Sequence, residues 1–192
     1  MSSALSDRPG PDVHNRILDA AETLVQTRGV AGLTLEAAAR LAGVSKGGLL
    51  YHFASKEALL DAALKRLSEY FRTEFETCVA AQPEGPGRVA RSMIAWAFGE
   101  DEMACDERDE RAAAVYLAAF HHDPALLDPI RAVYVTLRQA VLADGLPPGA
   151  GAAIMAAGDG AFMSRIFQLY AMSPEERRAI AAALSRLLEP LP

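Results

Sequence analysis

The stretch Thr34–Leu59, TLEAAARLAGVSKGGLLYHFASKEAL, decides the fold of this chain. Thr34 is a good N-cap for a short helix over Leu35–Ala42, and Gly43 can end that helix in a left-handed conformation. After a one-residue turn, Ser45 caps a second short helix of about eight residues. Two short helices joined by so tight a turn predict a helix-turn-helix arrangement.

The second of these helices carries features that suit a nucleic-acid surface. Gly47 and Gly48 each cost about 1 kcal/mol relative to Ala in a helix interior, so something should offset that cost. Close approach of the helix backbone to the major groove of DNA would do so, because a single helix fits that groove. Alternatively, the two glycines permit tight packing between helices. The neighbouring side chains suit phosphate contacts (Ser45, Lys46, Tyr51, His52) or a thymine methyl (Leu50).

The apolar residues of the same stretch predict how its helices pack. A first helix from Asp12 to Gly29 presents an apolar stripe at helical spacing, and Gly29 can end it. We expect a small core among the helix-turn-helix residues Leu35, Ala38, Leu41, Val44 and Leu49. Residues 12–56 therefore predict a three-helix head, preceded by a disordered tail over residues 1–11.

The rest of the chain is also expected to be helical. Ser55 caps a long fourth helix that extends to about Ala80. Five further helices are indicated at 86–99, 108–121, 124–144, 149–171 and 174–188, and the last begins with a capping box, Ser173-Pro174-Glu175-Glu176. The acidic stretch Glu100–Glu110 is interpreted as a solvated loop, with cation or partner binding as the alternative. The predicted fold class is all-α, with nine helices and a larger body over residues 57–192.

Composition sets limits on function. The 192 residues are 51% hydrophobic and 23% charged, which is ordinary for a globular protein, and the net charge is −6. Through Lys56 there are six Lys or Arg against five Asp or Glu, and the remainder has 13 against 20, so the acidity lies in the body. We expect no leader, because the opening MSSALSDRPGP is polar and has no apolar region. We expect no membrane span, because the longest uncharged run, Gly145–Gly158, is only 14 residues long and contains two prolines. Two cysteines without metal or redox spacing indicate a reduced, cytoplasmic chain.

The segment VSKGGLLYHFASKEALL resembles the signature of the tetracycline-repressor (TetR) family. The resemblance covers Ile17 to about Leu60 residue by residue, and the nine-helix layout covers the rest as architecture. It places these residues on the recognition helix: Ser45, Lys46, Gly47, Gly48, Leu50, Tyr51 and His52. It places Thr34 and Lys56 at phosphate-contacting helix starts and Phe53 in the core. Gly48 and Leu50 stand where base-bonding side chains are frequent in the family, so the resemblance implies sparse direct base readout.

In that family, the second half binds a small-molecule effector and dimerises through the last two helices. The residues of helix 149–171 support a dimer, because they are apolar around the whole helix axis. Such a helix requires burial on all sides, and a partner subunit would bury the side that its own chain leaves exposed. The expected dimer residues are Ile166, Ile180, Leu184 and Leu187. Pocket candidates are Met93, Trp96, Phe120, Tyr134 and Phe162, although an aromatic residue at helical spacing is more often plain core.

The sequence therefore predicts a transcriptional regulator, by default a repressor, that binds a palindromic DNA operator as a homodimer and is released by a small-molecule effector. No catalytic motif is present, and no cofactor is expected. His121, His122 and Asp123 suggest a metal site weakly, because consecutive helical residues point about 100° apart. Two alternatives stay open: an interaction protein whose head no longer binds DNA, and a small helical enzyme.

Overall fold

The computed structural model describes residues 13–99 and 107–189, and over these residues the chain contains nine α-helices and no strand. The predicted all-α, nine-helix class is confirmed. The tail over residues 1–11 and most of the acidic stretch Glu100–Glu110 lie outside the described residues. The chain forms two compact units: one comprises the described residues up to Arg66 together with Val115–Leu127, and the other comprises Leu67–Ala114 and the residues from Asp128 onward.

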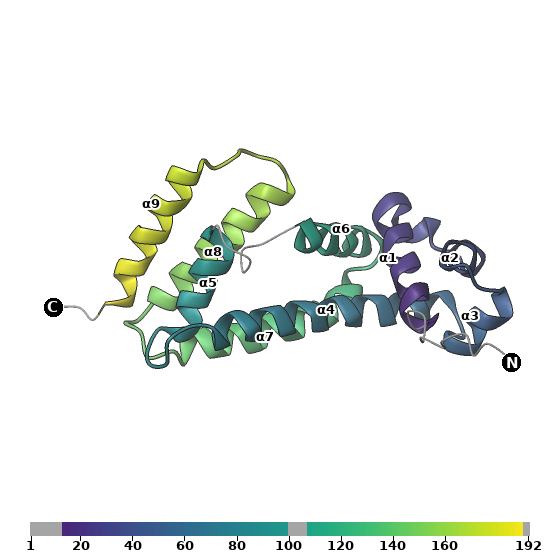
Figure 1. Cartoon of the computed structure of the whole chain (residues 1–192), viewed down its shortest axis with the longest axis horizontal. Helices are drawn as coiled ribbons and strands as arrows, with labels where there is room; N and C mark the ends of the chain where they lie inside the picture. The colour runs from purple at the N-terminus through teal and green to yellow at the C-terminus, as the bar shows by residue number, and fades with distance from the viewer. Residues whose placement is uncertain (1–12, 100–106, 190–192) are drawn as a thin grey trace, which may run out of the picture. The chain divides into compact units, whose positions relative to one another are not determined.

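The first unit is built on helices α1 (Val13–Gly32), α2 (Leu35–Ala42) and α3 (Lys46–His52) (Figure 1). Helix α1 packs against α2, and α2 packs against α3. The largest fully buried side chains of this unit form its core: Ile17, Leu18, Val25, Leu33, Leu49, Leu59 and Leu64. The predicted end of the first helix at Gly29 corresponds to a break there, where φ is 67°, before one more helical turn reaches Gly32.

Two long helices contribute to both units. Helix α4 (Lys56–Ala80) gives its first part to the first unit, where Arg66 forms ion pairs of 2.7 Å with Asp19 and with Glu22 of α1. Helix α6 (Glu107–His122) gives its second half to the same unit, where the buried Tyr116 hydroxyl donates to the Leu64 carbonyl over 2.7 Å. The compact unit is therefore larger than the helix-turn-helix. The division into a DNA-binding domain over residues 12–56 and an effector-binding and dimerisation domain over residues 57–192 stays a prediction.

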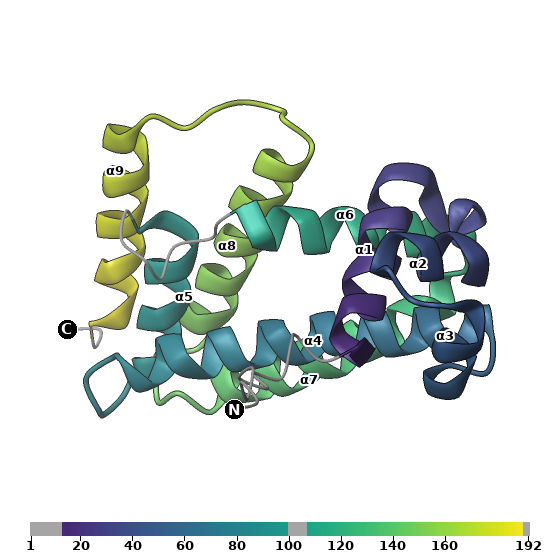
Figure 2. The same ribbon diagram turned by 45° about the vertical axis from the view of Figure 1, so that its right-hand side comes forward.

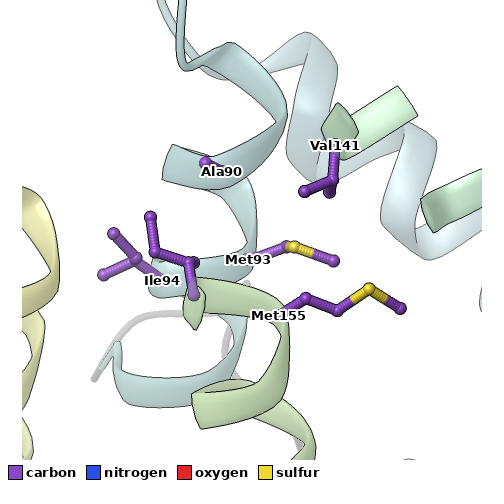
Figure 3. Close-up of a cluster of buried hydrophobic side chains, with 6 residues drawn as sticks. Ala90, Met93, Ile94, Val141 and Met155 are labelled. Atoms are coloured by element: carbon purple, nitrogen blue, oxygen red, sulfur yellow. The ribbon is translucent and has the colours of Figure 1, made fainter. Parts of the chain in front are cut away.

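The second unit centres on α5 (Arg88–Phe98), which packs against α7 (Asp128–Leu142), α8 (Ala150–Ile166) and α9 (Pro174–Ser185) (Figure 2). Side chains from α5, α7 and α8 meet in a buried cluster (Figure 3), which consists of Ala90, Met93, Ile94, Val141, Ile154 and Met155. The close α7–α8 approach requires Gly151, because a Cβ there would lie 2.6 Å from the Val141 side chain and 3.0 Å from its carbonyl oxygen.

The start of α5 is fixed by a residue that follows α7. The Asp144 carboxylate accepts hydrogen bonds from the Val89 N–H at 3.1 Å and the Ala90 N–H at 2.8 Å. Its backbone carbonyl also accepts from the Gly87 N–H over 2.8 Å, and φ at Gly87 is 79°. Asp144 thus caps α5 from a distant part of the chain, because Gly87 at the N-cap has no side chain to do so.

Three predictions about local structure need correction. Helix α8 ends at Ile166 instead of residue 171, because Gln168 takes a left-handed conformation (φ 51°) and the Leu169 N–H bonds back to the Ser164 carbonyl. The predicted helix 124–144 is divided into a 3₁₀ turn, η1 (Pro124–Leu127), and α7. Leu41 is 53% exposed instead of packed, because it lies about 100° around the helix from the buried Ala42.

The C-terminal helix begins as predicted. The Ser173 hydroxyl accepts from the Glu176 N–H over 3.2 Å, and the Glu176 carboxylate accepts from the Ser173 N–H over 2.8 Å, which confirms the capping box. Helix α9 is followed by a 3₁₀ turn, η2 (Arg186–Leu188). None of the described helices is long and apolar enough to cross a membrane.

Candidate nucleic-acid interface

Capping residues fix where the two helices of the helix-turn-helix begin and end. The Thr34 hydroxyl accepts from the Ala37 N–H at 3.1 Å, and the Ser45 hydroxyl accepts from the Gly48 N–H at 3.0 Å. Between them, Gly43 closes α2 in the left-handed conformation, with φ at 66°. Both hydroxyls use an acceptor lone pair for capping and keep their own proton for donation. Thr34 and Ser45 can therefore cap a helix and donate to a phosphate oxygen at the same time.

Helix α3 has one buried side and one exposed side. Leu49 is fully buried, and Phe53, directly after the helix, is buried as expected, so these two side chains hold α3 against the rest of the unit. The outer side carries Lys46, Gly47, Leu50 and Tyr51, all exposed, and Tyr51 is 87% exposed. The structure thus places most of the expected recognition-helix residues on one accessible surface.

At neither glycine of α3 would an added Cβ pack against another described helix. A Cβ at Gly47 would meet only the Ser45 hydroxyl oxygen, 4.0 Å away, and neither glycine has a positive φ. A Cβ at Gly48 would approach the same oxygen to 3.3 Å, which is tight. Helix–helix packing within the described residues therefore does not account for Gly47. The expected close approach of this backbone to DNA stays a prediction.

Lys46 is paired within the free chain. Its ammonium group forms an exposed ion pair and hydrogen bond with the Glu36 carboxylate of α2. The hydrogen bond from Lys46 holds the pKa of Glu36 below its usual range. This pair joins the two helices of the motif across their turn, and it places an acidic group beside the surface expected to meet phosphates. Sequence reasoning missed Glu36, because its role depends on the folded proximity of two residues ten positions apart.

An aromatic group lies at the C-terminal end of α3. The His52 ring is 5.3 Å from that of Tyr51 and 5.9 Å from that of His14, at the start of α1. The His14 ring is also 4.9 Å from that of Phe53. His52 is half-buried in this group, so it offers less surface to a ligand than Tyr51 does. Lys56, also half-buried, lies in the first turn of α4, where Ser55 accepts from the Ala58 N–H over 3.1 Å.

The expected pocket residues are divided between the units. Trp96 of α5 and Phe162 of α8 are both half-buried, with ring centroids 5.5 Å apart. Met93 belongs to the buried cluster of Figure 3. Tyr134 of α7 donates to the Asp159 carboxylate of α8 over 3.2 Å, whereas Phe120 is an exposed residue of the first unit. Sequence reasoning missed Asp159, although it directly follows the longest uncharged run.

The expected dimer residues differ in exposure. Ile166 and Ile180 are half-buried, and Leu187 is exposed. Leu184 packs against the buried cluster of its own chain. Within the described residues, no three His, Cys, Asp or Glu side chains are grouped so that they could hold a metal ion.

Two family models match this chain, one in each half. Residues 17–63 match the family model for bacterial regulatory proteins of the tetR family, and residues 87–189 match that for the tetracyclin repressor-like C-terminal domain. The chain belongs to the TetR family. It has the helix-turn-helix of these regulatory proteins, and the predicted family resemblance is confirmed.

Several known proteins are similar to this chain over part or most of its length. The transcriptional regulator TtgR of Pseudomonas putida is 29% identical over 127 residues, 66% of this chain and 58% of TtgR. EthR of Mycolicibacterium smegmatis is 32% identical over 90 residues, 46% of this chain and 42% of EthR. The match thus spans less than two thirds of these relatives. The multidrug binding protein EbrR, in a crystal structure with malachite green, is 32% identical with a TM-score of 0.65, covering 94% of this chain and 100% of that one.

Proposed function

We propose that this TetR-family protein is a transcriptional repressor that binds a palindromic DNA operator as a homodimer and is released by a small organic effector. The observation that carries the DNA-binding part is the outer side of α3, where an exposed lysine and tyrosine flank a glycine that no internal contact requires. Phosphate contacts from Lys46, Lys56, Thr34 and Ser45 would position this helix. The sparse hydrogen-bonding groups on α3 favour recognition that depends strongly on the DNA backbone and shape.

The homodimer is supported by apolar surface on the last two α-helices. Apart from Arg165, the exposed residues of α8 and its C-cap are small or apolar and recur at helical spacing: Ala153, Ala156, Gly160, Met163 and Phe167. On α9 and the turn after it, Ala179, Ala183 and Leu187 form a second exposed stripe. Small and apolar residues in such stripes allow two helix pairs to pack closely. A twofold dimer would then present two recognition helices to successive major grooves, which lie about 34–36 Å apart.

The effector is proposed to bind the second unit. The half-buried Trp96–Phe162 pair and the half-buried Asp159, which accepts from the exposed Tyr134, supply aromatic and polar groups there. EbrR structures with malachite green and with ethidium support an aromatic organic effector for this chain. An effector that favours one arrangement of the heads would change operator affinity by about 5- to 150-fold, the usual range of allosteric coupling. We assign the protein to the compartment that holds its operator, the cytoplasm, and propose no catalytic activity.

The test of DNA binding is a titration of labelled DNA, taken from upstream of the chain's own gene, followed by fluorescence anisotropy at several salt concentrations. Replacing Lys56 by Ala should weaken binding to all sequences and lower the slope of log affinity against log salt by about one. Lys65→Ala is the matched control, because Lys65 lies farther along α4 and pairs with Asp61 at 2.8 Å. Equal slopes for wild type and both variants would remove Lys56 from the interface.

A further inference from the structure

Asp159 is an isolated acidic residue on an apolar helix. It follows the 14-residue uncharged run Gly145–Gly158, and Arg165 is the only other charged residue of α8. Most residues on α8 that face the neighbouring helices are small or aliphatic, and Ile154 and Met155 belong to the buried cluster. An alanine at this position would continue the apolar pattern at lower desolvation cost, so the carboxylate calls for a specific partner.

The carboxylate is half-buried and lacks a cationic partner among the described residues. Its hydrogen bond comes from the Tyr134 hydroxyl of α7, at 3.2 Å from Oδ1. Burial raises the pKa of Asp159, and the hydrogen bond from Tyr134 opposes that shift. Burial, followed by the nearby charge of Asp159, likewise raises the pKa of Tyr134. The charged form of Asp159 is therefore poorly compensated within the chain, and an incoming cation would compensate it.

Aromatic and thioether groups lie on the same side of α8. Phe162 and Met163 follow Asp159 by three and four residues, so all three side chains neighbour one another on the helix surface. The Phe162 ring lies 5.5 Å from that of Trp96, and Met163 is 41% exposed. Aromatic faces attract cations, and a methionine side chain adapts to flat ligands of different shape.

We propose that Asp159, held by Tyr134, is the charge-recognising group of the effector site, and that this site takes aromatic organic cations. The inference rests on the proposed function in that it concerns the same effector site. The carboxylate would pair with the positive charge, while Phe162 and Trp96 would cover the aromatic part of the ligand. Neutral aromatic compounds of similar size would gain only the second contribution.

The experiment is a titration of the full-length chain with ethidium in the absence of DNA, followed by ethidium and Trp96 fluorescence. Ethidium carries a permanent positive charge, and phenanthridine, uncharged at pH 7.5, is the neutral comparison. Asp159→Asn should weaken ethidium binding by about 10-fold or more, since it removes a charge-assisted contact. It should change phenanthridine binding much less. Asp128→Asn is the matched control: it removes an equal charge from the exposed start of α7.

A further variant, Asp159→Glu, keeps the negative charge. It therefore distinguishes a loss of ethidium binding caused by the missing charge from one caused by misfolding. Ethidium binding that is retained in Asp159→Glu and lost in Asp159→Asn supports charge recognition, whereas an equal loss in both folded variants overturns it. Equal weakening of ethidium and phenanthridine would also overturn it. If the wild-type chain binds operator DNA but not ethidium, this inference fails and the proposed function stands. If it binds ethidium as described but no DNA, the proposed function fails instead.

Discussion

Replacing Gly47 by Ala should move stability and DNA affinity in opposite directions. The nearest atom to an added Cβ is the Ser45 hydroxyl oxygen at 4.0 Å, so the methyl group meets no obstacle within the chain. Ala stabilises a helix relative to Gly by about 1 kcal/mol in the interior. The gain is smaller in the first turn, where Gly47 lies. The variant should therefore melt up to about 2–4 °C higher than wild type.

DNA affinity should fall in the same variant. If the α3 backbone approaches DNA at Gly47, the methyl group enters a close-packed contact, which costs about 1–3 kcal/mol. That corresponds to about a 5- to 150-fold loss of affinity. Thermal unfolding by circular dichroism and fluorescence anisotropy with operator DNA measure the two quantities on one preparation.

A control separates the two effects. The control is Thr23→Ala. Thr23 lies on α1, outside the helix-turn-helix, and its hydroxyl donates to the Asp19 carbonyl at 2.8 Å. The substitution should stabilise the same unit by a few tenths of a kcal/mol, because such bonds do not favour helices, and leave DNA affinity unchanged. A Gly47→Ala protein that is stabilised yet binds DNA as tightly as wild type would show that the α3 backbone does not approach DNA at Gly47.

Three further results are expected. Glu36→Gln should strengthen DNA binding, because it removes an anion beside the phosphates and releases Lys46. Lys46→Ala should raise the pKa of Glu36 toward its usual range, though not fully, because a backbone hydrogen bond still lowers it; an NMR titration showing no rise would contradict the pairing. Asp144→Ala should lower the free energy of unfolding by about 1–2 kcal/mol in urea denaturation through loss of the α5 cap, and Asp144→Asn by less, since it keeps one acceptor. Phe167→Glu should yield monomers in light scattering, whereas Leu142→Glu, at an even more exposed residue on α7, should stay dimeric; a dimer in both would place the interface elsewhere.

Local signals made much of the fold predictable. Thr34, Ser45 and the Ser173 capping box were identified correctly because a cap is defined by residues within one turn of each other. The family signature lies in the same short stretch of sequence. The end of α8 was missed because the left-handed residue there is Gln168, and neither Gly nor Pro marks the position.

Contacts between residues that are far apart in the sequence limit how much of the candidate site can be predicted. The Glu36–Lys46 pair, the Asp144 cap and the Tyr134–Asp159 hydrogen bond join residues that are 10 to 55 positions apart. No periodicity reveals such a contact, because each depends on how two elements meet in the folded chain. A weaker signal did exist for Asp159, a single acid directly after 14 uncharged residues, and it can be looked for in other sequences.

The central claim is that this chain recognises DNA as a twofold dimer through α3. In vitro selection from random DNA, with the purified full-length chain, tests it most directly. We expect enrichment of an inverted repeat whose half-sites are centred about 10–10.5 base pairs apart, or a multiple of that spacing, and loss of enrichment with Gly47→Ala. Failure of a folded, dimeric preparation to enrich any sequence would contradict the claim.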